Sequence, residues 1–351
     1  MHISILGLRN FRNLRDGEYR FSPGLTLITG ENGAGKTNLL EILSLLTGWG
    51  TFPGRKVGDL PRWGTSEKAF LKARFEGEYF LEVGSEVGRQ NLLRCGSRRC
   101  TAGDIRSRVS GIFFIPSDME LVEGSSSVRR RFVNRLCALL HPHYATKLYE
   151  YKRLHRQKTS LLRQGRSTSG VDRLLAPSGG WLWDLRERAL RLFVNRGLSS
   201  VGSILPLPVR VTLLRGGGGL HEDPGEDFLQ SLKGHAQEEH RRGRVLCGPS
   251  GDDLLLEVQG RPASVVLSRG QRRRLALALM LGMGYLLEDS SHRKPLFVMD
   301  EVTAELDMPG RALLFETLQT TKWQVLAATA EPFWEDWPGR IRSLRGGVLE
   351  D

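Results

Sequence analysis

The chain is poor in cysteine and in long apolar stretches. Four of its 351 residues are cysteine, and none belongs to a CxxC pair, which argues against a disulfide framework or a structural zinc site. The nearest two, Cys95 and Cys100, are either reduced thiols or a bridge. Residues 275–287 form the longest apolar run, which is shorter than the roughly 20 residues that cross a bilayer. Because the start also lacks signal-peptide features, we expect a cytoplasmic protein without a membrane span.

Acidic residues are scarce relative to basic ones. Lys and Arg number 51 against 39 Asp and Glu, so the formal net charge is +12, which favours a polyanionic partner. Residues 128–166 concentrate this excess, with eleven basic residues and one acid. A helical face of mixed charge would indicate simple solvation, whereas one sign favours phosphate contacts. The candidate DNA-binding residues are Arg129, Arg130, Arg131, Lys152, Arg153 and Arg156.

The middle of the chain has helical periodicity, whereas its ends alternate strands and helices. Residues 128–164 predict helices broken near Pro142, and residues 181–198 predict a second stretch that could pair with them as an antiparallel arm. Residues 176–180 (APSGG) are expected to form a loop, and Trp181 and Trp183 to be core rather than base-stacking residues. Apolar segments at 25–29, 112–115, 296–299 and 324–328 predict strands. This pattern indicates an α/β domain, residues 1–117 and 206–351, interrupted by a helical insertion at 118–205.

A phosphate-binding loop follows the apolar strand expected at residues 25–29. Residues 30–37 read GENGAGKT and match G-x-x-x-x-G-K-[ST] between a strand and a helix. Lys36 is expected to reach the β- and γ-phosphates, and the Thr37 hydroxyl to bind Mg²⁺. The predicted nucleotide contacts are Gly30, Glu31, Asn32, Gly33, Ala34, Gly35, Lys36 and Thr37.

Two acids end a later apolar strand, in the sequence LFVMDE at residues 296–301. Asp300 is placed to hold Mg²⁺ together with Thr37, directly or through water. Glu301 is placed to orient or deprotonate the attacking water. With Lys36, these are the predicted catalytic residues of a site for ATP or GTP with Mg²⁺.

Two further segments resemble the ABC ATPase superfamily. Residues 268–271 (SRGQ) are similar to its signature motif, and residues 304–307 (AELD) to its D-loop. The resemblance implies that two ATPase heads close on two ATPs, with Ser268, Gly270, Gln271 and Asp307 at the nucleotide. Thr329 occupies the position of the superfamily's switch histidine. A homodimer that forms on ATP binding is therefore expected.

The chain as a whole resembles the RecF family of bacterial recombination mediators. The similar stretches are residues 8–13, 33–41, 115–131, 246–254, 268–272 and 300–307. This resemblance implies an SMC-like ABC ATPase head with a helical arm, Arg12 at the nucleotide base, and Asn38 extending the phosphate loop. It also implies a weak ATPase that clamps duplex DNA at gaps and single-strand junctions. RecR and RecO would be its partners in loading RecA onto SSB-coated strands during DNA repair and replication restart.

Several positions depart from the family pattern. Ser250 and Gly251 replace a His and an Arg, and Asn134 replaces an Asp. Two other functions remain open at this point. One is a nucleotide-binding subunit of an ABC transporter, for which the basic insertion has no evident use. The other is a DNA-binding scaffold that does not respond to ATP.

Overall fold

The computed structural model describes residues 1–77, 81–88, 91–301, 306, 308–330 and 336–350, which form two compact units. The first unit comprises residues 1–119, 200–206 and 267–351, and the second comprises 120–199 and 207–266. Residues 207–266, expected in the ATPase domain, therefore belong to the second unit. The reason is local pairing, because strands within 207–266 pair with one another and a helix of this segment packs on a helix of the insertion.

The first unit contains a six-stranded sheet in the order β15-β14-β3-β13-β12-β8. Five of its strands are parallel, and β15 returns antiparallel to β14. The strands β3, β12 and β13 are apolar along most of their length, as expected for parallel strands covered on both faces. Their bounds are β3 Leu25–Thr29, β8 Gly111–Phe114, β12 Leu296–Met299, β13 Gln324–Thr329, β14 Arg340–Arg345 and β15 Val348–Glu350.

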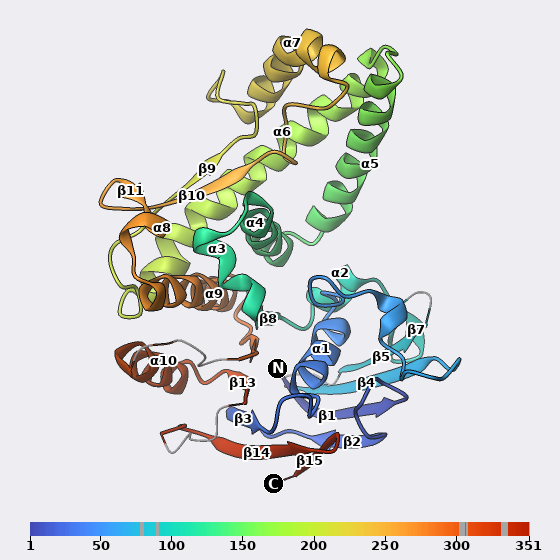
Figure 1. Ribbon diagram of the computed structural model, residues 1–351, viewed down its shortest axis with the longest axis vertical. Helices are drawn as coiled ribbons and strands as arrows, with labels where there is room; N and C mark the ends of the chain where they lie inside the picture. The colour runs from blue at the N-terminus through green and yellow to red at the C-terminus, as the bar shows by residue number, and fades with distance from the viewer. Residues whose placement is uncertain (78–80, 89–90, 302–305, 307, 331–335, 351) are drawn as a thin grey trace. The chain divides into compact units, whose positions relative to one another are not determined.

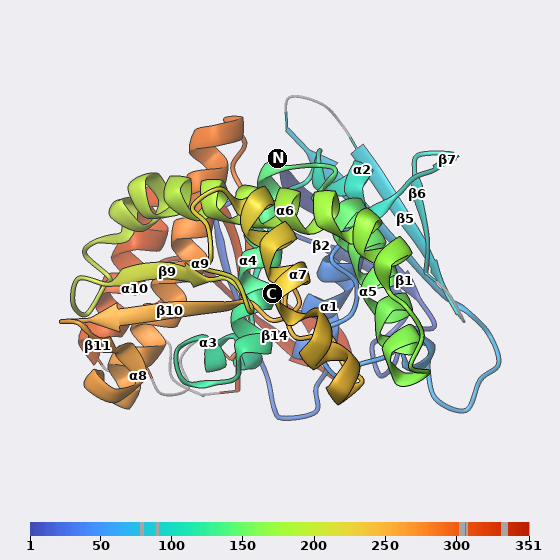
Figure 2. The same ribbon diagram turned by 90° about the horizontal axis from the view of Figure 1, so that it is seen from above.

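A second, antiparallel sheet of the same unit has the order β2-β1-β4-β5-β6-β7. Its inner face packs into the core, and α1 (Lys36–Leu46) contacts both sheets. Figure 2 shows α1 between the two sheets and helices α9 and α10 on the other side of the parallel sheet. The strand bounds are β1 His2–Arg9, β2 Gly17–Arg20, β4 Ala69–Glu76, β5 Leu81–Val87, β6 Asn91–Cys95 and β7 Arg98–Arg99.

The remaining helices of the first unit include the long apolar α9 (Arg269–Ser291). Its residues 275–284 are all buried, and Gly284 leaves room for Trp323, whose ring would lie 2.4 Å from an added Cβ. No helix among the described residues is long and apolar enough to cross a membrane. The others are α2 Ala102–Arg106, α10 Met308–Thr321 and the short 3₁₀ turns η1 Val57–Asp59, η2 Pro116–Asp118 and η4 Ser199–Val201, the last at the border of the units.

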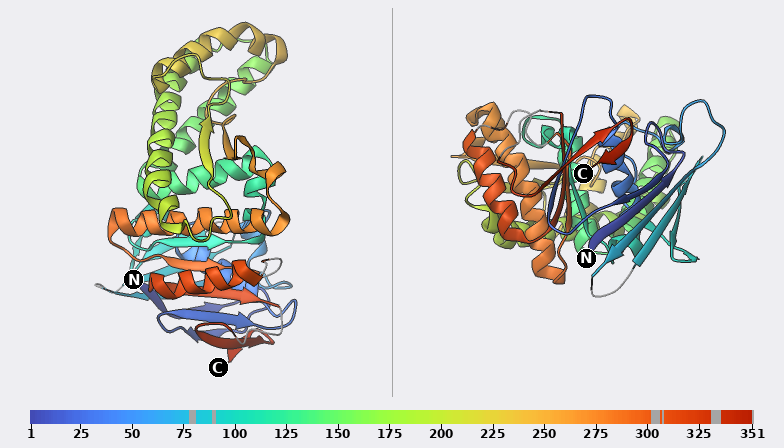
Figure 3. Two further views of the ribbon diagram at one scale, coloured as in Figure 1. Left: turned by 90° about the vertical axis from the view of Figure 1, so that its left-hand side faces the viewer. Right: turned by 90° about the horizontal axis from the view of Figure 1, so that it is seen from below.

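The second unit is mainly helical, with α5 and α6 side by side (Figures 1 and 3). The predicted break near Pro142 is confirmed, because α4 ends at Leu140 and α5 begins at Tyr144. The bounds are α3 Glu120–Glu123, α4 Ser126–Leu140, α5 Tyr144–Arg163, α6 Ser169–Leu192, the π-helix η3 Phe193–Leu198, α7 Pro224–Arg242 and α8 Ala263–Val266. A three-stranded sheet completes it, in the order β11-β10-β9, with β9 Arg210–Leu214, β10 Asp253–Val258 and β11 Arg261–Pro262.

The expected loop at residues 176–180 is wrong, because this segment lies inside α6. Its glycines are packing residues. A Cβ on Gly179 would lie 2.0 Å from the ring of Phe228, and one on Gly180 would lie 2.7 Å from the Cα of Gly225. They therefore let α7 approach α6 closely. The core assignment of Trp183 is confirmed, since its side chain is fully buried.

Candidate nucleotide-binding site

The candidate site lies at one edge of the parallel sheet. Because β3, β13 and β12 run in the same direction, their carboxyl ends meet there, as is usual for ligand sites of open α/β sheets. The phosphate loop follows β3, Asp300 follows β12, and Thr329 ends β13. Thr329 is fully buried and pairs in register with Thr29. Motifs almost 300 residues apart in the sequence are thus brought to one edge.

The phosphate loop uses glycines at positions where a side chain would be strained or would collide. Gly35 is the N-cap of α1 with φ of 107°, and its Cβ would lie 2.7 Å from Leu14 Cδ2. Gly33 has φ of 83° and faces open space, with nothing within 4 Å of an added Cβ. The loop therefore presents its main chain, at the N-terminus of α1, to any ligand that enters. This arrangement suits an anion.

Lys36 is almost fully buried and is held by its own loop. Its Nζ donates hydrogen bonds to the main-chain oxygens of Gly30 at 2.7 Å and Glu31 at 3.0 Å. Burial lowers the pKa of Lys36, although Glu301 and Asp300 oppose the change. A buried ammonium group whose described partners are carbonyl oxygens can exchange them for phosphate oxygens, which carry negative charge.

Asp300 and Thr37 form the part of the site that fits a cation. The Asp300 side chain is buried and accepts a hydrogen bond from the Thr37 hydroxyl. The pKa of Asp300 is raised to about 6, mainly because the buried carboxylate is poorly solvated and in smaller part because Glu301 is close. Its Oδ1 has no hydrogen-bond partner among the described residues. A buried, unsatisfied carboxylate oxygen next to a threonine hydroxyl fits Mg²⁺, which prefers oxygen ligands.

Glu301 is half-buried and adopts φ of 52°, in the left-handed region that non-glycine residues seldom occupy. This conformation costs free energy and is common where a side chain must be aimed at a site. Glu301 is near enough to Asp300 and Lys36 to shift the pKa of both. The three predicted catalytic residues therefore lie together.

Arg12 and Asn38 belong to a polar network beside the phosphate loop. The Arg12 Nη1 donates to Asn38 Oδ1 at 2.5 Å and pairs with Glu41 Oε2 at 2.7 Å. Arg55 Nη1 pairs with the same Glu41 oxygen at 2.6 Å. Sequence reasoning missed Glu41 and Arg55. The available signal was Glu41 itself, an acid within the mostly apolar residues 39–46 of α1, where a buried charge requires a partner.

The signature residues cap the N-terminus of α9. Ser268 Oγ accepts from the Gln271 main-chain N–H at 3.3 Å, and Gln271 Oε1 accepts from the Ser268 N–H at 3.0 Å. Ser268 is exposed and Gly270 half-buried. Within the described parts of the chain, no hydrogen bond joins these residues to the phosphate loop. Asp307 lies outside the described residues, so its predicted role stays a prediction.

The candidate DNA-binding residues fall into two groups. In the first, Arg129 forms a two-point ion pair with Asp253, with Nε–Oδ1 at 2.6 Å and Nη2–Oδ2 at 2.9 Å. Arg130 donates to the Asp252 main-chain oxygen at 2.7 Å, and Arg131 is half-buried. In the second, Lys152, Arg153 and Arg156 are exposed along α5. Of the six candidates, only this second group offers exposed cations.

Three positions that depart from the family pattern lie around one buried arginine, Arg186. Its Nη2 donates to Asn134 Oδ1 at 2.9 Å, and its Nη1 donates to the Pro249 main-chain oxygen at 2.7 Å and to the Asp252 carboxylate. Ser250 is hydrogen-bonded to the Tyr151 hydroxyl. Gly251 is in close main-chain contact with Gly216. These residues hold the second unit together, a structural role that sequence reasoning missed.

Comparison with known proteins decides the family. The model of the RecF/RecN/SMC N-terminal domain family matches residues 2–333. A relative from Deinococcus radiodurans, "DNA replication and repair protein RecF", is 34% identical and the match covers 98% of this chain and 94% of the relative. The chain belongs to the RecF family. The RecF family is part of the SMC-like ABC ATPases, which agrees with the phosphate loop and the α/β fold described above.

Solved structures show the same fold. A structure of the recombination mediator protein RecF-ATPrS in the RecFOR pathway has a TM-score of 0.88 at 23% identity, covering 99% of this chain and 97% of that chain. The SmcHead bound to the C-winged helix domain of ScpA has a TM-score of 0.59 at 15% identity, covering 100% and 96%. At these identities the likeness concerns the fold, and it confirms the predicted ABC-type head with its helical insertion.

Proposed function

We propose that this RecF-family chain is an ATP-dependent DNA-binding protein that acts as a recombination mediator in DNA repair and replication restart. The observation that carries the proposal is the meeting of Lys36, Thr37 and Asp300 at one sheet edge. The name of the Deinococcus relative, a DNA replication and repair protein, supports the process. The solved RecF with ATPrS supports ATP as the nucleotide.

The nucleotide is ATP, held as its Mg²⁺ complex. Lys36 exchanges its carbonyl partners for the β- and γ-phosphates, and main-chain N–H groups of residues 30–35 bind the other phosphate oxygens. Thr37 and Asp300 hold Mg²⁺, which neutralises phosphate charge when bound. Glu301 orients or deprotonates the attacking water. Hydrolysis of ATP is slow and is stimulated by DNA, and it releases the protein clamp from DNA.

ATP also drives formation of a homodimer. Ser268, Gly270 and Gln271 lie at the N-terminus of a 23-residue helix, and the main-chain donors of such a terminus favour a phosphate. In the proposed dimer these residues and Asp307 contact the ATP that the other protomer holds, and Thr329 contacts the γ-phosphate from within the protomer. The chain therefore dimerises because the second protomer completes each phosphate site.

DNA is bound through phosphates. Lys152, Arg153 and Arg156 are exposed, and the pKa of Lys152 is lowered by partial desolvation and by repulsion from Arg186, Arg130 and Arg156. Such a concentration of positive charge favours polyanion binding. The proposed target is duplex DNA at gaps and single-strand junctions in the cytoplasm. With RecR and RecO, the clamp promotes loading of RecA onto SSB-coated strands.

Sedimentation velocity tests the nucleotide part of this proposal. We expect wild type to change from monomer to dimer when Mg-ATP is added. Lys36→Met is expected to stay monomeric because it does not hold the phosphates. Ser268→Arg is expected to bind ATP and still stay monomeric, because it blocks only the second protomer's approach. Glu316→Arg, an exposed change on α10, is the control and should dimerise.

Two results would contradict the proposal. If the wild-type protein stays monomeric with saturating Mg-ATP, ATP does not drive dimerisation. If wild type and Lys36→Met both form a dimer that is equally stable with and without ATP, ATP does not control dimerisation. That result would favour a DNA-binding scaffold instead.

A further inference from the structure

Trp63 is the most exposed large hydrophobic side chain in the described parts of the chain, with Met308 and Val265 next. Its exposed fraction is 85%. A single exposed apolar residue is ordinary and by itself indicates no site. What distinguishes Trp63 is where its backbone is fixed and which residues share its cavity.

The main chain beside Trp63 is held firmly against the segment that precedes the phosphate loop. The Arg12 N–H donates to the Leu60 oxygen at 3.2 Å, and the Arg62 N–H donates to the Asn10 oxygen at 3.0 Å. The Arg62 Nη2 also donates to the Leu14 oxygen at 2.8 Å and to Asp16 Oδ1 at 2.6 Å. The indole is thus in solvent while its backbone is anchored, which is the arrangement of a pre-organised contact surface.

Trp63 lines a cavity of about 700 Å³ that reaches the phosphate loop. Among the other lining residues are Arg12, Asn13, Gly33 and Asn38. These residues are themselves joined, because Asn13 Nδ2 donates to the Gly33 oxygen at 2.7 Å and Asn38 Nδ2 donates to Asn13 Oδ1 at 2.8 Å. A nucleotide whose phosphates occupy the loop therefore has an adjacent cavity for its base, with an aromatic ring and several amide and guanidinium groups on its wall.

We propose that Trp63 is the stacking platform for the base of the bound nucleotide and that it makes the site prefer purines. This inference rests on the proposed nucleotide site. Stacking on an aromatic face strengthens the binding of a base and depends on ring overlap rather than on hydrogen-bond pattern. A purine offers more overlap with an indole than a pyrimidine does. Arg12, which lines the same cavity, carries a cation that attracts the π face of the base.

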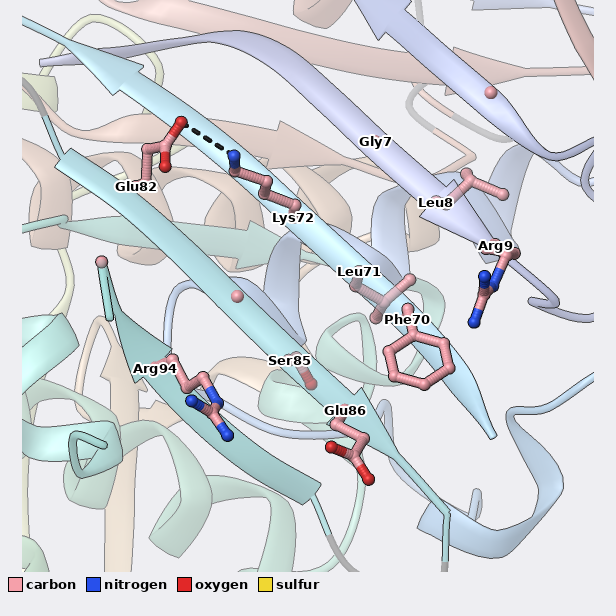
Figure 4. A pocket seen from close by; sticks show the side chains of 13 residues that line it. Gly7, Leu8, Arg9, Phe70, Leu71, Lys72, Glu82, Ser85, Glu86 and Arg94 are labelled. Carbon is pink, nitrogen blue, oxygen red and sulfur yellow. Dashed lines mark ion pairs between the residues drawn. The ribbon is translucent and has the colours of Figure 1, made fainter. Parts of the chain in front are cut away.

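Phe70 provides a matched aromatic control from another cavity of the same unit. It lies on the solvent-facing side of the antiparallel sheet, where the Arg9 guanidinium stands 4.6 Å from its ring centroid (Figure 4). The charges on that face are largely paired, as in Lys72 with Glu82 at 3.0 Å. Neither Phe70 nor these neighbours line the cavity of Trp63. Replacing Phe70 should leave nucleotide binding unchanged.

Isothermal titration with Mg-ATP, Mg-CTP and magnesium tripolyphosphate tests the proposal on the full chain. Trp63→Ala is expected to weaken ATP binding roughly tenfold and to reduce the preference of ATP over CTP, because stacking is lost. Its affinity for tripolyphosphate, which has no base, should equal that of wild type. Trp63→Phe should retain most of the ATP affinity. Phe70→Ala should match wild type with all three ligands.

Lys36→Ala separates this inference from the nucleotide site on which it rests. This variant should lose measurable affinity for both ATP and tripolyphosphate, since both ligands bind through the phosphate loop. If Trp63→Ala binds ATP within twofold of wild type while Lys36→Ala does not bind it, the stacking role is overturned and the nucleotide site stands. Equal weakening of ATP and tripolyphosphate by Trp63→Ala would also overturn it, because the effect would then be on the loop. Wild type that binds neither ligand would overturn both proposals.

Discussion

Buried charge is handled differently in the second unit and at the candidate nucleotide site of the first unit. In the second unit, the buried Lys158 ammonium lies 2.8 Å from Asp172 and 2.6 Å from Glu239, and the buried Arg186 is paired with Asp252. In the first unit, Lys36 is buried against carbonyl oxygens, and Asp300 has a buried oxygen with no hydrogen-bond partner among the described residues. Paired charges keep a fold in register, whereas charges left incompletely satisfied mark a place for a ligand.

Two buried aspartates make the same contrast. Burial raises the pKa of Asp300 to about 6, because the opposing effects of Thr37, Arg55 and Lys36 are too small to compensate. Burial also acts to raise the pKa of Asp227. There, however, the net direction is downward, because hydrogen bonds from Arg215 and from the main-chain N–H groups of Gly219 and Leu220 stabilise the carboxylate. The pKa values of the two buried carboxylates therefore differ because their hydrogen-bond and charge partners differ, not because one is more buried.

Removing a partner from a paired charge should have the largest effect. Arg186→Met leaves Asp252 buried without its cation, and we expect the free energy of unfolding to fall by about 3–5 kcal/mol. Denaturant unfolding followed by circular dichroism measures this. Arg188→Met, two residues along α6 in an exposed pair with Asp184, should change it by less than about 1 kcal/mol. Equal effects of the two changes would contradict the contrast.

Neutralising Asp300 should change the free energy of unfolding by a smaller amount and in the opposite direction. A folded-state pKa above the ordinary 3.8 means that the stability due to Asp300 is present below pH 3.8 and is lost as the pH rises through about 6. In metal-free buffer at pH 7.5, Asp300→Asn should therefore be more stable than wild type by roughly 1–3 kcal/mol. The difference should shrink towards pH 4.5.

Thermal unfolding at the two pH values measures this difference. Glu316→Gln, at an exposed position, should show no such dependence. Addition of Mg-ATP should stabilise wild type and have little effect on Asp300→Asn. An Asp300→Asn protein less stable than wild type at pH 7.5 would show that the carboxylate is compensated.

Exposed charges should affect stability least and show their effect in DNA binding. Replacing Lys152, Arg153 and Arg156 together by Ala should leave the free energy of unfolding within about 1 kcal/mol of wild type. It should lower DNA affinity, and the dependence of log affinity on log salt should become shallower by about 0.9 for each DNA phosphate that the protein no longer neutralises. Anisotropy titrations at several salt concentrations measure both. The matched triple change of Arg173, Arg188 and Arg191 on α6 should leave the salt dependence unchanged.

Much of the fold could be predicted because its signals are local. The phosphate loop and the buried strands around it are short apolar runs followed by glycines or acids, and Pro142 separates two helices by removing a donor. The segment at 176–180 could not be predicted in this way. Its Pro and Gly residues indicate a loop, but Phe228 and Gly225, which require small residues at Gly179 and Gly180, are 45 or more residues away in the sequence.

The candidate site shows the same limit. Lys36, Thr37 and Asp300 were predicted because motif and strand-end position are visible in the sequence. The charge of residues 128–166 was visible, but its accessibility was not. Arg129 forms an ion pair with Asp253, 124 residues later, and Lys158 forms one with Glu239. The position of Trp63 beside the site could not be predicted from the sequence, because only the folded chain brings its segment beside residues 10–14.

In the proposed function, nucleotide held by Lys36 and Asp300 controls DNA binding. The most direct test is fluorescence anisotropy of a labelled gapped duplex titrated with wild type and Lys36→Met, each with and without Mg-ATP. We expect wild type to bind the duplex more tightly with Mg-ATP and Lys36→Met to bind it equally with and without ATP. Binding that is the same with and without Mg-ATP in both proteins would contradict this proposal.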